Sequence, residues 1–453
     1  MINTQNLIDK ICCTLTTGGL TAIQCCSAQG ALETLCQPVF SVANIAALPN
    51  ATTYNGRMVY VVSEGKYYYA VFGEWDDSLS TEKQVITTEL YSWGANNYGQ
   101  LGNNERYTER SSPVSVVGGL TKWCQISAGA YHSLGVRTNG TAWAWGRASY
   151  GRLGDGTTIS RCSPVSVVGG FTDWCQLSAS CHHSVAVRQN GTAWSWGYNN
   201  NAQLGDNTTV NKSSPVSVIG GITDWCQISA GGCFSLAVRQ NGTAWGWGNN
   251  SYGRLGDNTT VSKSSPVSVV GGFTDWCQVA AGGNNHSLGV RQNGTAWGWG
   301  SNGDGRLGDN TTVSKSSPVS VVGGFTDWCQ VNASRLNSHG IRQNGTLWAW
   351  GNNFCGTLGD NTTTARSSPV SVVGGFTDWC QISFGYRTAI AVRQNGTAWA
   401  WGQNQNGSVG DCTTISRSSP VSVVGGQTWC QVSSNGGNSN TFSFGIKTTV
   451  AGL

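Results

Sequence analysis

The sequence predicts an all-β fold, a seven-bladed β-propeller of four-stranded antiparallel blades preceded by a small mixed α/β region. Three observations predict it: a repeat with a regular period, four strand-like segments in each repeat, and complementary segments at the two ends of the array. A tryptophan before glycine marks the repeat at Trp93, Trp145, Trp196, Trp247, Trp299, Trp350 and Trp401. Successive positions differ by 51 or 52 residues, and periods near 50 residues are typical of propellers and solenoids.

Each repeat contains four short segments rich in β-branched and aromatic residues. They read VSVV, WCQIS, SLGVR and TAWAW, and glycine, proline and asparagine separate them. We therefore expect four antiparallel strands per repeat. An Asn-Gly pair lies between the last two segments, and this pair favours tight two-residue hairpins because both positions need positive φ. It occurs at 139–140, 190–191, 241–242, 293–294, 344–345 and 395–396.

Large and small residues alternate in the last of these segments. The residue between the two aromatic residues of W-x-W-G is always small: Ser92, Ala144, Ser195, Gly246, Gly298, Ala349 and Ala400. Closely packed neighbouring sheets need large side chains on one face and small ones on the other. The alternation therefore favours blades packed face to face around a ring.

The two ends of the repeat array complement each other. The first repeat begins at Glu89–Gly94 without a preceding S-L-x-V-R strand, and the last repeat ends at Phe442–Lys447 without a following W-x-W-G strand. Pairing of these segments completes one blade from both ends of the chain and removes two exposed sheet edges. We therefore predict a closed ring of seven blades.

The repeats resemble those of the regulator of chromosome condensation family. The resemblance depends on stretches such as Ile126–Ser133, Thr141–Gly146 and Tyr150–Gly154, and it covers roughly residues 89–447. The resemblance implies a seven-bladed propeller, which agrees with the number of repeats counted above.

The first 88 residues differ from the repeats. Apolar residues near helical spacing predict short helices in residues 1–40, and aromatic and β-branched segments between Ala47 and Trp75 predict a small β-element. This second pattern resembles short segments of tail-fibre and other virion proteins of tailed bacteriophages. We therefore predict a helical docking segment at 1–40, a β-element and linker at 41–88, and the propeller at 89–453. The expected docking residues are Leu7, Ile8, Ile11, Leu20 and Ile23.

Composition and charge exclude several classes of protein. Charged residues make up 11% of the chain and the net charge is +4, a weak field for binding a phosphate backbone, so we expect no nucleic-acid partner. No apolar run reaches the ~18 residues of a membrane span, and Met1–Lys10 lacks the pattern of a signal peptide. We therefore expect no membrane insertion and no export by the general secretory route.

The sequence lacks common nucleotide and metal motifs, and its repeated polar residues have structural explanations. Six repeats carry an aspartate after Leu-Gly or Val-Gly, and Asn103 takes this position in the first. Such an aspartate either caps its own turn or contributes to a ring of ligands, and we favour the turn because a role repeated in every blade is typical of scaffold. The aspartates are Asp155, Asp206, Asp257, Asp309, Asp360 and Asp411.

The cysteines and histidines also have structural explanations. Seven of the 17 cysteines follow tryptophan once per repeat, so we interpret them as small buried hydrophobic residues in a reducing compartment. The pairs at 12–13 and 25–26, with Cys36, lack the usual C-x-x-C spacing of zinc sites. His182 and His183 have no acidic neighbour in their loop. We therefore predict no catalytic residue, no metal site and no cofactor.

The repeats differ from one another mainly in two loops, one after W-C-Q-x-S and one after W-G. Strands solve the same packing problem in every blade, whereas loops are free to differ. If these loops share one face of the ring, their aromatic, amide and arginine residues form a recognition surface; neutral loop divergence is the alternative. The candidate partner-binding residues are Tyr131, His182, Phe234, Asn285, Arg335, Tyr386, Arg147, Tyr150, Tyr198, Tyr252 and Phe354.

The predicted function is that of a non-enzymatic structural or adhesion protein of a tailed-phage virion. Residues 1–88 are expected to dock on other virion proteins, and the propeller is expected to bind a host cell-surface glycan or protein. The predicted location is the virion, assembled in the host cytoplasm. Self-association into a homo-oligomer is left open.

Three alternatives remain at this stage. The first is an intracellular regulatory propeller that binds a protein partner such as a small GTPase, since the best-known member of the resembled family promotes nucleotide exchange on a small nuclear GTPase. The second is an enzyme, which requires a unique acid pair or nucleophile in one blade. The third is a secreted inhibitor, against which the lack of a signal-peptide pattern counts.

Overall fold

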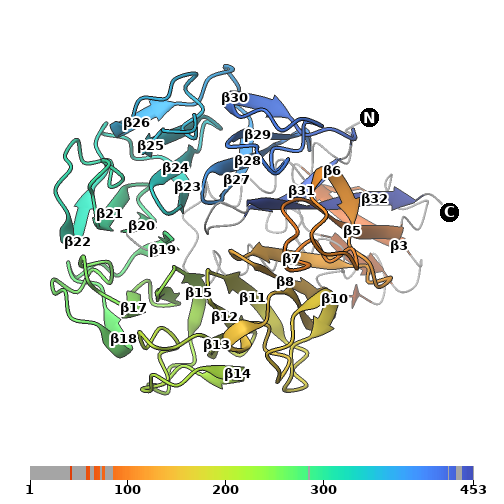
Figure 1. The fold of residues 1–453 in the computed structure, drawn as a ribbon, viewed down its shortest axis with the longest axis horizontal. Coiled ribbons are helices and arrows are strands. Elements are labelled where there is room, and N and C mark those ends of the chain that lie inside the picture. Colours follow the sequence, from red (N-terminus) through yellow and green to blue (C-terminus); the bar gives the residue numbers. More distant parts are fainter. Residues whose placement is uncertain are drawn as a thin grey trace.

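The computed structural model describes residues 41–42, 58–61, 66–71, 74–76, 85–283, 286–426, 428–434 and 441–451. Seven four-stranded antiparallel sheets are arranged radially around a central axis (Figure 1). The predicted fold class, a seven-bladed propeller closed by strands from both ends, is confirmed. The predicted helical segment at 1–40, with Leu7, Ile8, Ile11, Leu20 and Ile23, lies outside the described residues.

The first three blades are continuous in sequence. Blade 1 contains β7 (Trp123–Ala128), β8 (His132–Arg137), β9 (Ala142–Gly146) and β10 (Arg161–Ser166). Blade 2 contains β11 (Trp174–Ala179), β12 (His183–Arg188), β13 (Ala193–Gly197) and β14 (Lys212–Ser217). Blade 3 contains β15 (Trp225–Ala230), β16 (Phe234–Arg239), β17 (Ala244–Gly248) and β18 (Lys263–Ser268).

The next three blades repeat this order. Blade 4 contains β19 (Trp276–Ala281), β20 (His286–Arg291), β21 (Ala296–Gly300) and β22 (Lys315–Ser320). Blade 5 contains β23 (Trp328–Ala333), β24 (Asn337–Arg342), β25 (Leu347–Gly351) and β26 (Arg366–Ser371). Blade 6 contains β27 (Trp379–Phe384), β28 (Thr388–Arg393), β29 (Ala398–Gly402) and β30 (Arg417–Ser422).

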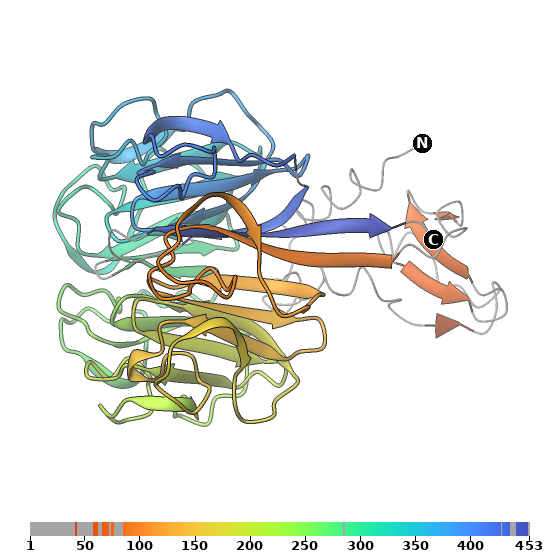
Figure 2. The ribbon, with the colours of Figure 1, turned by 45° about the vertical axis from the view of Figure 1, so that its right-hand side comes forward.

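Blade 7 is assembled from both ends of the chain. Its strand order is β31 (Trp429–Ser434), β32 (Phe442–Ala451), β5 (Val85–Gly94) and β6 (Arg110–Ser115). β32 and β5 pair antiparallel over their full length, from Phe442 opposite Gly94 to Ala451 opposite Val85. The paired strands extend beyond the other blades (Figure 2). The strand register thus begins four residues before the predicted boundary at residue 89.

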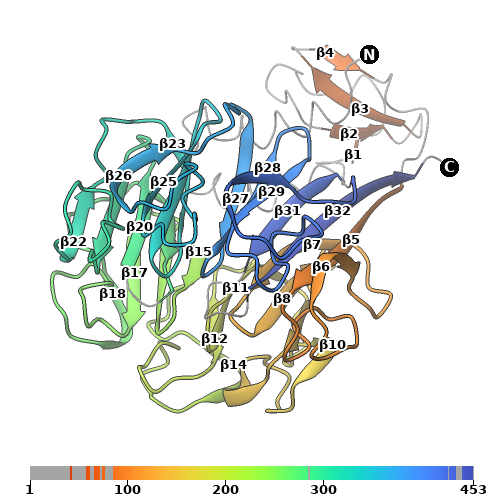
Figure 3. The same ribbon diagram turned by 45° about the horizontal axis from the view of Figure 1, so that its top comes forward.

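A separate four-stranded sheet precedes the propeller. Its order is β1 (Ser41–Val42), β2 (Met58–Val61), β3 (Lys66–Val71) and β4 (Glu74–Asp76). β1 pairs parallel with β2, and the remaining pairs are antiparallel. Figure 3 shows this sheet beyond the end of the β5–β32 ribbon.

Hydrophobic cores lie between neighbouring blades. Between blades 1 and 2, Leu134 and Ala144 pack with Trp174 and Trp196, and all four side chains are buried. Between blades 7 and 1, Phe444 packs against Trp145, with ring centroids 5.8 Å apart. The small residue between the two aromatic residues in the third strand of each blade therefore leaves room for the next blade's tryptophan, as the sequence predicts.

Glutamine side chains connect the inner strands of adjacent blades. The Gln125 amide donates to the Leu177 carbonyl at 3.1 Å and accepts from the Leu177 N–H at 2.7 Å. The same hydrogen bonding, in whole or in part, recurs at Gln176, Gln227, Gln278, Gln330, Gln381 and Gln431. Each amide satisfies backbone groups on the edge of the next sheet, which otherwise stay unpaired at the channel.

The indole of the second tryptophan in the third strand of each blade makes another bond between blades. Trp145 Nε1 donates to the Gln100 carbonyl at 2.9 Å, and Trp196 Nε1 donates to the Arg152 carbonyl at 3.0 Å. Both rings are fully buried. These indoles therefore fix the loop after W-G of one blade against the third strand of the next.

The cysteines after tryptophan differ from the prediction. They lie at a β-bulge between tryptophan and glutamine and are partly exposed, and Cys175 is exposed. The bulge turns two consecutive residues out of strict alternation, so the tryptophan is buried while the cysteine is not. The Cys124 Sγ lies 3.3 Å from the Val136 carbonyl. None of the cysteines within the described ranges forms a disulfide.

Candidate functional site

The two variable loops of each repeat lie at the same end of the sheets. Consecutive antiparallel strands place the β7–β8 and β9–β10 connections at one end and the β8–β9 turn at the other. Two hydrogen bonds support this: Arg147 N–H donates to the Tyr131 carbonyl at 2.9 Å, and Trp174 N–H donates to the Gly140 carbonyl at 3.1 Å. We call these ends the loop face and the turn face.

Aromatic residues from three consecutive blades meet on the loop face. The ring centroids of Tyr98 and Tyr131 lie 5.4 Å apart, and Tyr131 is nearly parallel to His182 at 6.4 Å. Tyr150 lies 6.2 Å from His182 and 4.9 Å from Tyr198. Aromatic rings in such edge and stacked arrangements hold one another in place. The result is a preformed surface that crosses two blade boundaries.

Two arginines from the β9–β10 loop complete this surface. The Arg147 guanidinium lies over Tyr98 and Tyr131, 4.8 and 5.4 Å from the ring centroids. The Arg152 guanidinium lies 5.6 Å from the Tyr150 centroid. We name the set of Tyr98, Tyr131, Arg147, Tyr150, Arg152, His182 and Tyr198 the aromatic–arginine cluster.

The local backbone places Tyr150 at the tip of its loop. The β9–β10 loop contains a short 3₁₀ turn, η2 (Ser149–Gly151), in which Tyr150 has a φ of 66°. Gly151 follows with a φ of 80°, and a Cβ there would meet the Ser213 Cα at 2.3 Å. Only glycine allows the loop to approach blade 2 this closely. Tyr150 therefore projects outward and is 44% exposed.

Burial and positive charge set the electrostatics of the cluster. Burial lowers the pKa of His182 to about 4, and the charges of Arg152 and Arg147 add to the shift. The imidazole is therefore neutral near pH 7. Burial, followed by the charge of Arg147, lowers the pKa of Arg152 to about 10. The cluster thus carries two positive charges at neutral pH.

A second group of variable residues surrounds a pocket between blades 5 and 6. The pocket has a volume of about 180 Å³, and its lining includes Phe354, Tyr386 and Arg387. The Tyr386 ring contacts two guanidinium groups, those of Arg335 at 5.0 Å and Arg387 at 4.8 Å. Phe354 is 77% exposed. This pocket is a second candidate surface on the loop face.

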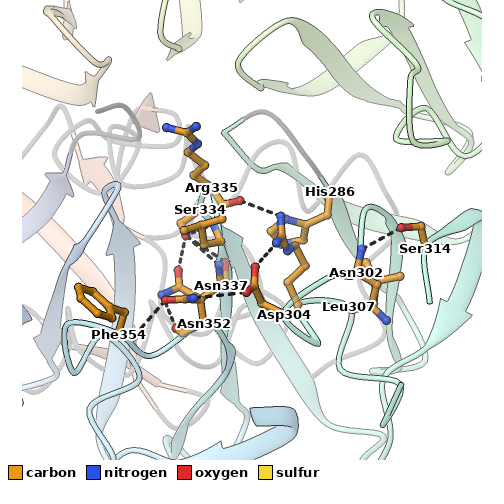
Figure 4. A network of polar contacts seen from close by, with 12 residues as sticks. His286, Asn302, Asp304, Leu307, Ser314, Ser334, Arg335, Asn337, Asn352 and Phe354 are labelled. Atoms are coloured by element: carbon orange, nitrogen blue, oxygen red, sulfur yellow. Dashed lines mark hydrogen bonds and ion pairs between the residues drawn. The ribbon is translucent and has the colours of Figure 1, made fainter. Parts of the chain in front are cut away.

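A network of polar side chains holds the loop that lines this pocket. Asn352 Nδ2 donates to Asp304 at 3.3 Å, and Asp304 also pairs with Arg306 (Figure 4). Asn337 Nδ2 donates to the Asn352 carbonyl at 3.2 Å, and the Phe354 N–H donates to Asn352 Oδ1 at 3.0 Å. The network therefore fixes the loop that carries Phe354.

The structure brings some predicted residues together and separates others. Tyr131, Arg147, Tyr150, His182 and Tyr198 belong to one cluster. Tyr386 and Phe354 line the second pocket, and Arg335 lies over the Tyr386 ring. Tyr252 is 51% exposed, and the Arg254 guanidinium lies 5.5 Å from its ring centroid. Asn285 lies outside the described residues.

The candidate Phe234 requires a correction. Phe234 is the first residue of β16 and is fully buried in the core between blades 3 and 4. It occupies the position of His132 in β8 and His183 in β12, whose side chains are also buried. The neighbouring loop ends one residue earlier, so the Phe234 side chain points into the core and is not exposed on the loop face.

Two members of the cluster are missing from the predicted set. Tyr98 stands before glycine as Tyr150 and Tyr252 do, and this shared position in the repeat was the available signal. Arg152 stands before Leu-Gly, next to a segment that repeats in every blade. Only the fold shows that its side chain lies under Tyr150.

The repeated aspartates and histidines have the structural roles that the sequence predicts. Asp257 Oδ1 accepts hydrogen bonds from Thr259 N–H at 3.1 Å and from Asn250 Nδ2 at 2.9 Å. His183 Nε2 lies 3.0 Å from Ser235 Oγ, and burial lowers the pKa of this histidine to about 3. The portion of the chain that the structure describes contains no group of three metal-binding side chains.

The seven inner strands surround a central channel. A cavity of about 130 Å³ in this channel is lined mainly by serine, alanine and glycine, including Ser127, Ser178 and Ser229. The Ser127 hydroxyl accepts the Ala179 N–H at 2.9 Å, and Ser178 accepts the Ala230 N–H at 3.0 Å. These hydroxyls therefore serve contacts between blades. No described helix has the length and apolar character needed to cross a bilayer.

Fold and site together define a repeat propeller with one loop-rich face that carries aromatic and arginine residues. The sequence profile of the regulator of chromosome condensation (RCC1) repeat matches residues 89–136, 139–187, 190–238, 241–290, 293–335 and 344–392. These matches cover more than half of the chain. The protein belongs to the regulator of chromosome condensation repeat family.

Curated relatives come from plants and mammals. The ultraviolet-B receptor UVR8 of Arabidopsis thaliana is 29% identical over 344 residues, which cover 73% of this chain and 76% of the receptor. The human E3 ubiquitin-protein ligase HERC2 is 27% identical over 360 residues, which cover 75% of this chain and 7% of the ligase. The chain thus spans most of one relative and a small part of the other.

Solved structures share the fold at low sequence identity. Human WBSCR16 matches with a TM-score of 0.71 and 18% identity, over 80% of this chain and 98% of that protein. Yeast RCC1 (Prp20), solved with Kap60, matches with a TM-score of 0.71 and 19% identity, over 82% of this chain and 90% of that protein. These matches support the fold of the propeller.

The comparisons overturn the predicted virion function and location. Two relatives that match about three quarters of the chain are a plant receptor and a human ubiquitin ligase, not virion proteins. The phage interpretation depended on a short pattern between Ala47 and Trp75, whereas the matches depend on the repeats themselves. Adhesion to a host glycan, docking on virion proteins and location in a virion are therefore wrong as predictions.

Proposed function

We propose that this protein is a non-enzymatic regulatory propeller that binds a protein partner through its loop face. The aromatic–arginine cluster is the observation that supports this proposal most strongly. Tyrosine and arginine are enriched in residues that dominate protein interfaces. Here they come from three blades and are held by mutual contacts before any partner arrives.

The preformed arrangement favours recognition because little side-chain freedom remains to be lost on binding. Arg147 is held between two rings and donates to Ser149 Oγ at 3.0 Å. Tyr150 and Tyr198 restrain each other. Each rotamer-rich side chain that is already ordered avoids about 0.5–1.5 kcal/mol of ordering cost.

A binding role also agrees with the distribution of polar contacts. The repeated carboxylates form turns and ion pairs of the scaffold, such as Asp155 with Arg161 at 3.0 Å. Three buried histidines, His132, His183 and His286, face serine hydroxyls, as His132 does with Ser184 at 2.9 Å. A reaction would need an acid, base or nucleophile beside a substrate pocket. The carboxylates and histidines named above instead make hydrogen bonds and ion pairs within the scaffold.

Affinity capture with two matched triple variants tests the proposal. One variant carries Tyr131→Ala, Tyr150→Ala and Tyr198→Ala on the loop face. The other carries Gln189→Ala, Gln240→Ala and Gln292→Ala, exposed residues beside the turns of the opposite face. We expect partners captured by the wild type to be lost with the first variant and retained with the second. Equal capture by both variants contradicts the proposal.

A small GTPase is one candidate partner, since Prp20p of Saccharomyces cerevisiae, which shares this fold, has binding properties to Gsp1p and histones. The release of a fluorescent guanine nucleotide from purified Gsp1p, with and without the propeller, tests this partner. Accelerated release that the loop-face variant abolishes supports a GTPase. Unchanged release directs the search to other proteins.

A further inference from the structure

We propose that the aromatic–arginine cluster recognises a carboxylate-rich segment of the partner protein, with Arg147 as the contacting cation and Arg152 as a buried source of positive charge. This inference rests on the proposed function and specifies the chemistry of its binding surface. It depends on the guanidinium groups of Arg147 and Arg152, which have no carboxylate partner, unlike most arginines of the described residues.

Arg152 is a buried cation without a carboxylate partner. Its side chain is 0% exposed, and it donates to the Ser149 carbonyl at 2.9 Å and to the Cys181 carbonyl at 2.7 Å. Its Nη2 atom is buried and has no hydrogen-bond acceptor. A buried charge normally has a paired counterion, because removing it from water is costly.

Arg147 adds a second positive charge on the surface above. It is half-buried, lies over Tyr98 and Tyr131, and hydrogen-bonds to Ser149 Oγ. No ion pair joins Arg147 or Arg152 to a carboxylate within the described ranges. His182 between these groups is neutral because its pKa is lowered to about 4. The cluster therefore has positive charge and no internal compensation.

Other arginines of the repeat have their positive charge compensated by an aspartate of the same chain. On the turn face, Arg188 pairs with Asp173 at 2.7 Å and Arg291 pairs with Asp275 at 2.7 Å. The same pairing recurs at Arg239, Arg342 and Arg393. The scaffold thus supplies an aspartate to these five turn-face arginines, whereas the equivalent Arg137 donates to the Thr121 carbonyl. The two arginines of the cluster lack this aspartate, and a carboxylate of the partner takes its place.

Carboxylate is the anion that these groups fit best. A guanidinium donates two parallel N–H bonds to one carboxylate, and the aromatic rings beside it restrict water and strengthen the interaction. The exposed Tyr150 ring offers apolar contact to the stems of glutamate side chains. The weak overall charge of +4 favours a local acidic segment over a long polyanion.

Fluorescence anisotropy with the full chain tests the inference. The probe is a labelled short peptide of alternating glutamate and glycine, and its reference is the same peptide with glutamine in place of glutamate. We expect the glutamate peptide to bind at least about tenfold more tightly than its reference. We also expect its affinity to fall as NaCl rises from about 50 to about 500 mM.

Arg147→Gln tests the contacting cation, and Arg137→Gln is its matched control. Both variants remove one positive charge from blade 1, but Arg137 lies at the end of β8 near the turn face and donates to the Thr121 carbonyl at 3.0 Å. We expect about a tenfold loss of glutamate-peptide affinity in Arg147→Gln, no comparable loss in Arg137→Gln, and partial rescue by Arg147→Lys. Arg147→Gln avoids the folding defect expected of a change at buried Arg152.

Three results overturn the inference. The first is equal binding of the glutamate and glutamine peptides. The second is an equal loss in Arg147→Gln and Arg137→Gln, which indicates a nonspecific effect of net charge. The third is a single-stranded oligonucleotide that binds more tightly than the glutamate peptide. If capture of a protein partner still depends on Tyr131, Tyr150 and Tyr198, the proposed function stands while the acidic recognition fails.

Discussion

Gln431 Oε1 accepts a hydrogen bond from the Ile126 N–H at 3.0 Å, although 305 residues separate them in the chain. This bond joins the inner strand of blade 7 to that of blade 1. It repeats, at the point of closure, the contact that neighbouring blades make everywhere else around the channel. The ring is thus continuous at the junction between the two ends.

The variant Gln431→Ala tests the contribution of this contact to closure. It removes the acceptor and leaves the Ile126 N–H unpaired, so we expect a loss of about 1–3 kcal/mol in the free energy of unfolding. Gln330→Ala removes the corresponding acceptor for Ile382 between blades 5 and 6. Urea denaturation followed by tryptophan fluorescence measures both losses. If the free energy of unfolding falls in Gln330→Ala but not in Gln431→Ala, the Gln431 contact at the junction does not contribute to stability.

Protonation of buried histidines makes the stability pH-dependent. Burial lowers the pKa of His183 from 6.5 to about 3, with further lowering by His182 and Arg152. Between these values the unfolded chain binds a proton that the folded protein does not. The free energy of unfolding therefore falls as the pH decreases from 6.5, by up to about 1.4 kcal/mol per pH unit for this histidine.

The variant His183→Asn isolates this contribution. Asn337 occupies the equivalent position in β24, so the scaffold accepts asparagine there. We expect a smaller slope of unfolding free energy against pH in His183→Asn between about pH 4.5 and 6.5. Thermal denaturation at a series of pH values gives the slope. Identical slopes in variant and wild type exclude His183 as a source of the pH dependence.

Replacement of a repeated aspartate separates scaffold from recognition. Asp257→Ala removes the acceptor for Thr259 and Asn250 and the ion pair with Lys263 at 3.5 Å. We expect a loss of about 1–3 kcal/mol in stability, with unchanged affinity for any partner of the loop face. Asp257→Asn retains an acceptor oxygen, as Asn103 does in the first repeat, and serves as the milder control. An affinity loss in a folded Asp257→Ala protein contradicts the scaffold role.

The sequence determined the ring more completely than the site. Closure was predictable because Glu89–Gly94 and Phe442–Lys447 each lack the strand that the other provides. The extension of the pairing to Val85 and Ala451 was not, since the added residues do not belong to the repeat. The periodic pattern therefore predicts the strand residues that pack between blades. It does not predict the residues that extend β5 and β32 by pairing only with each other.

The errors at the site have a physical reason. Variability between repeats identifies a position that is free to differ, but it does not give the direction of the side chain. Phe234 varies and is buried, because the first residue of that strand points into the core. The position of Arg152 also varies between repeats, but its place beside the repeated Leu-Gly does not show that its charge lies under the variable surface. Side-chain direction at loop ends follows from the fold alone.

Site-specific photo-crosslinking compares the two faces of the propeller most directly. A benzophenone amino acid replaces Tyr131 on the loop face in one protein and exposed Gln240 beside a turn in another. We expect a discrete crosslinked partner from position 131, lost when Arg147→Gln is added, and none from position 240. The same partner crosslinked from position 240, with nothing from position 131, would contradict the central claim that the loop face is the binding surface.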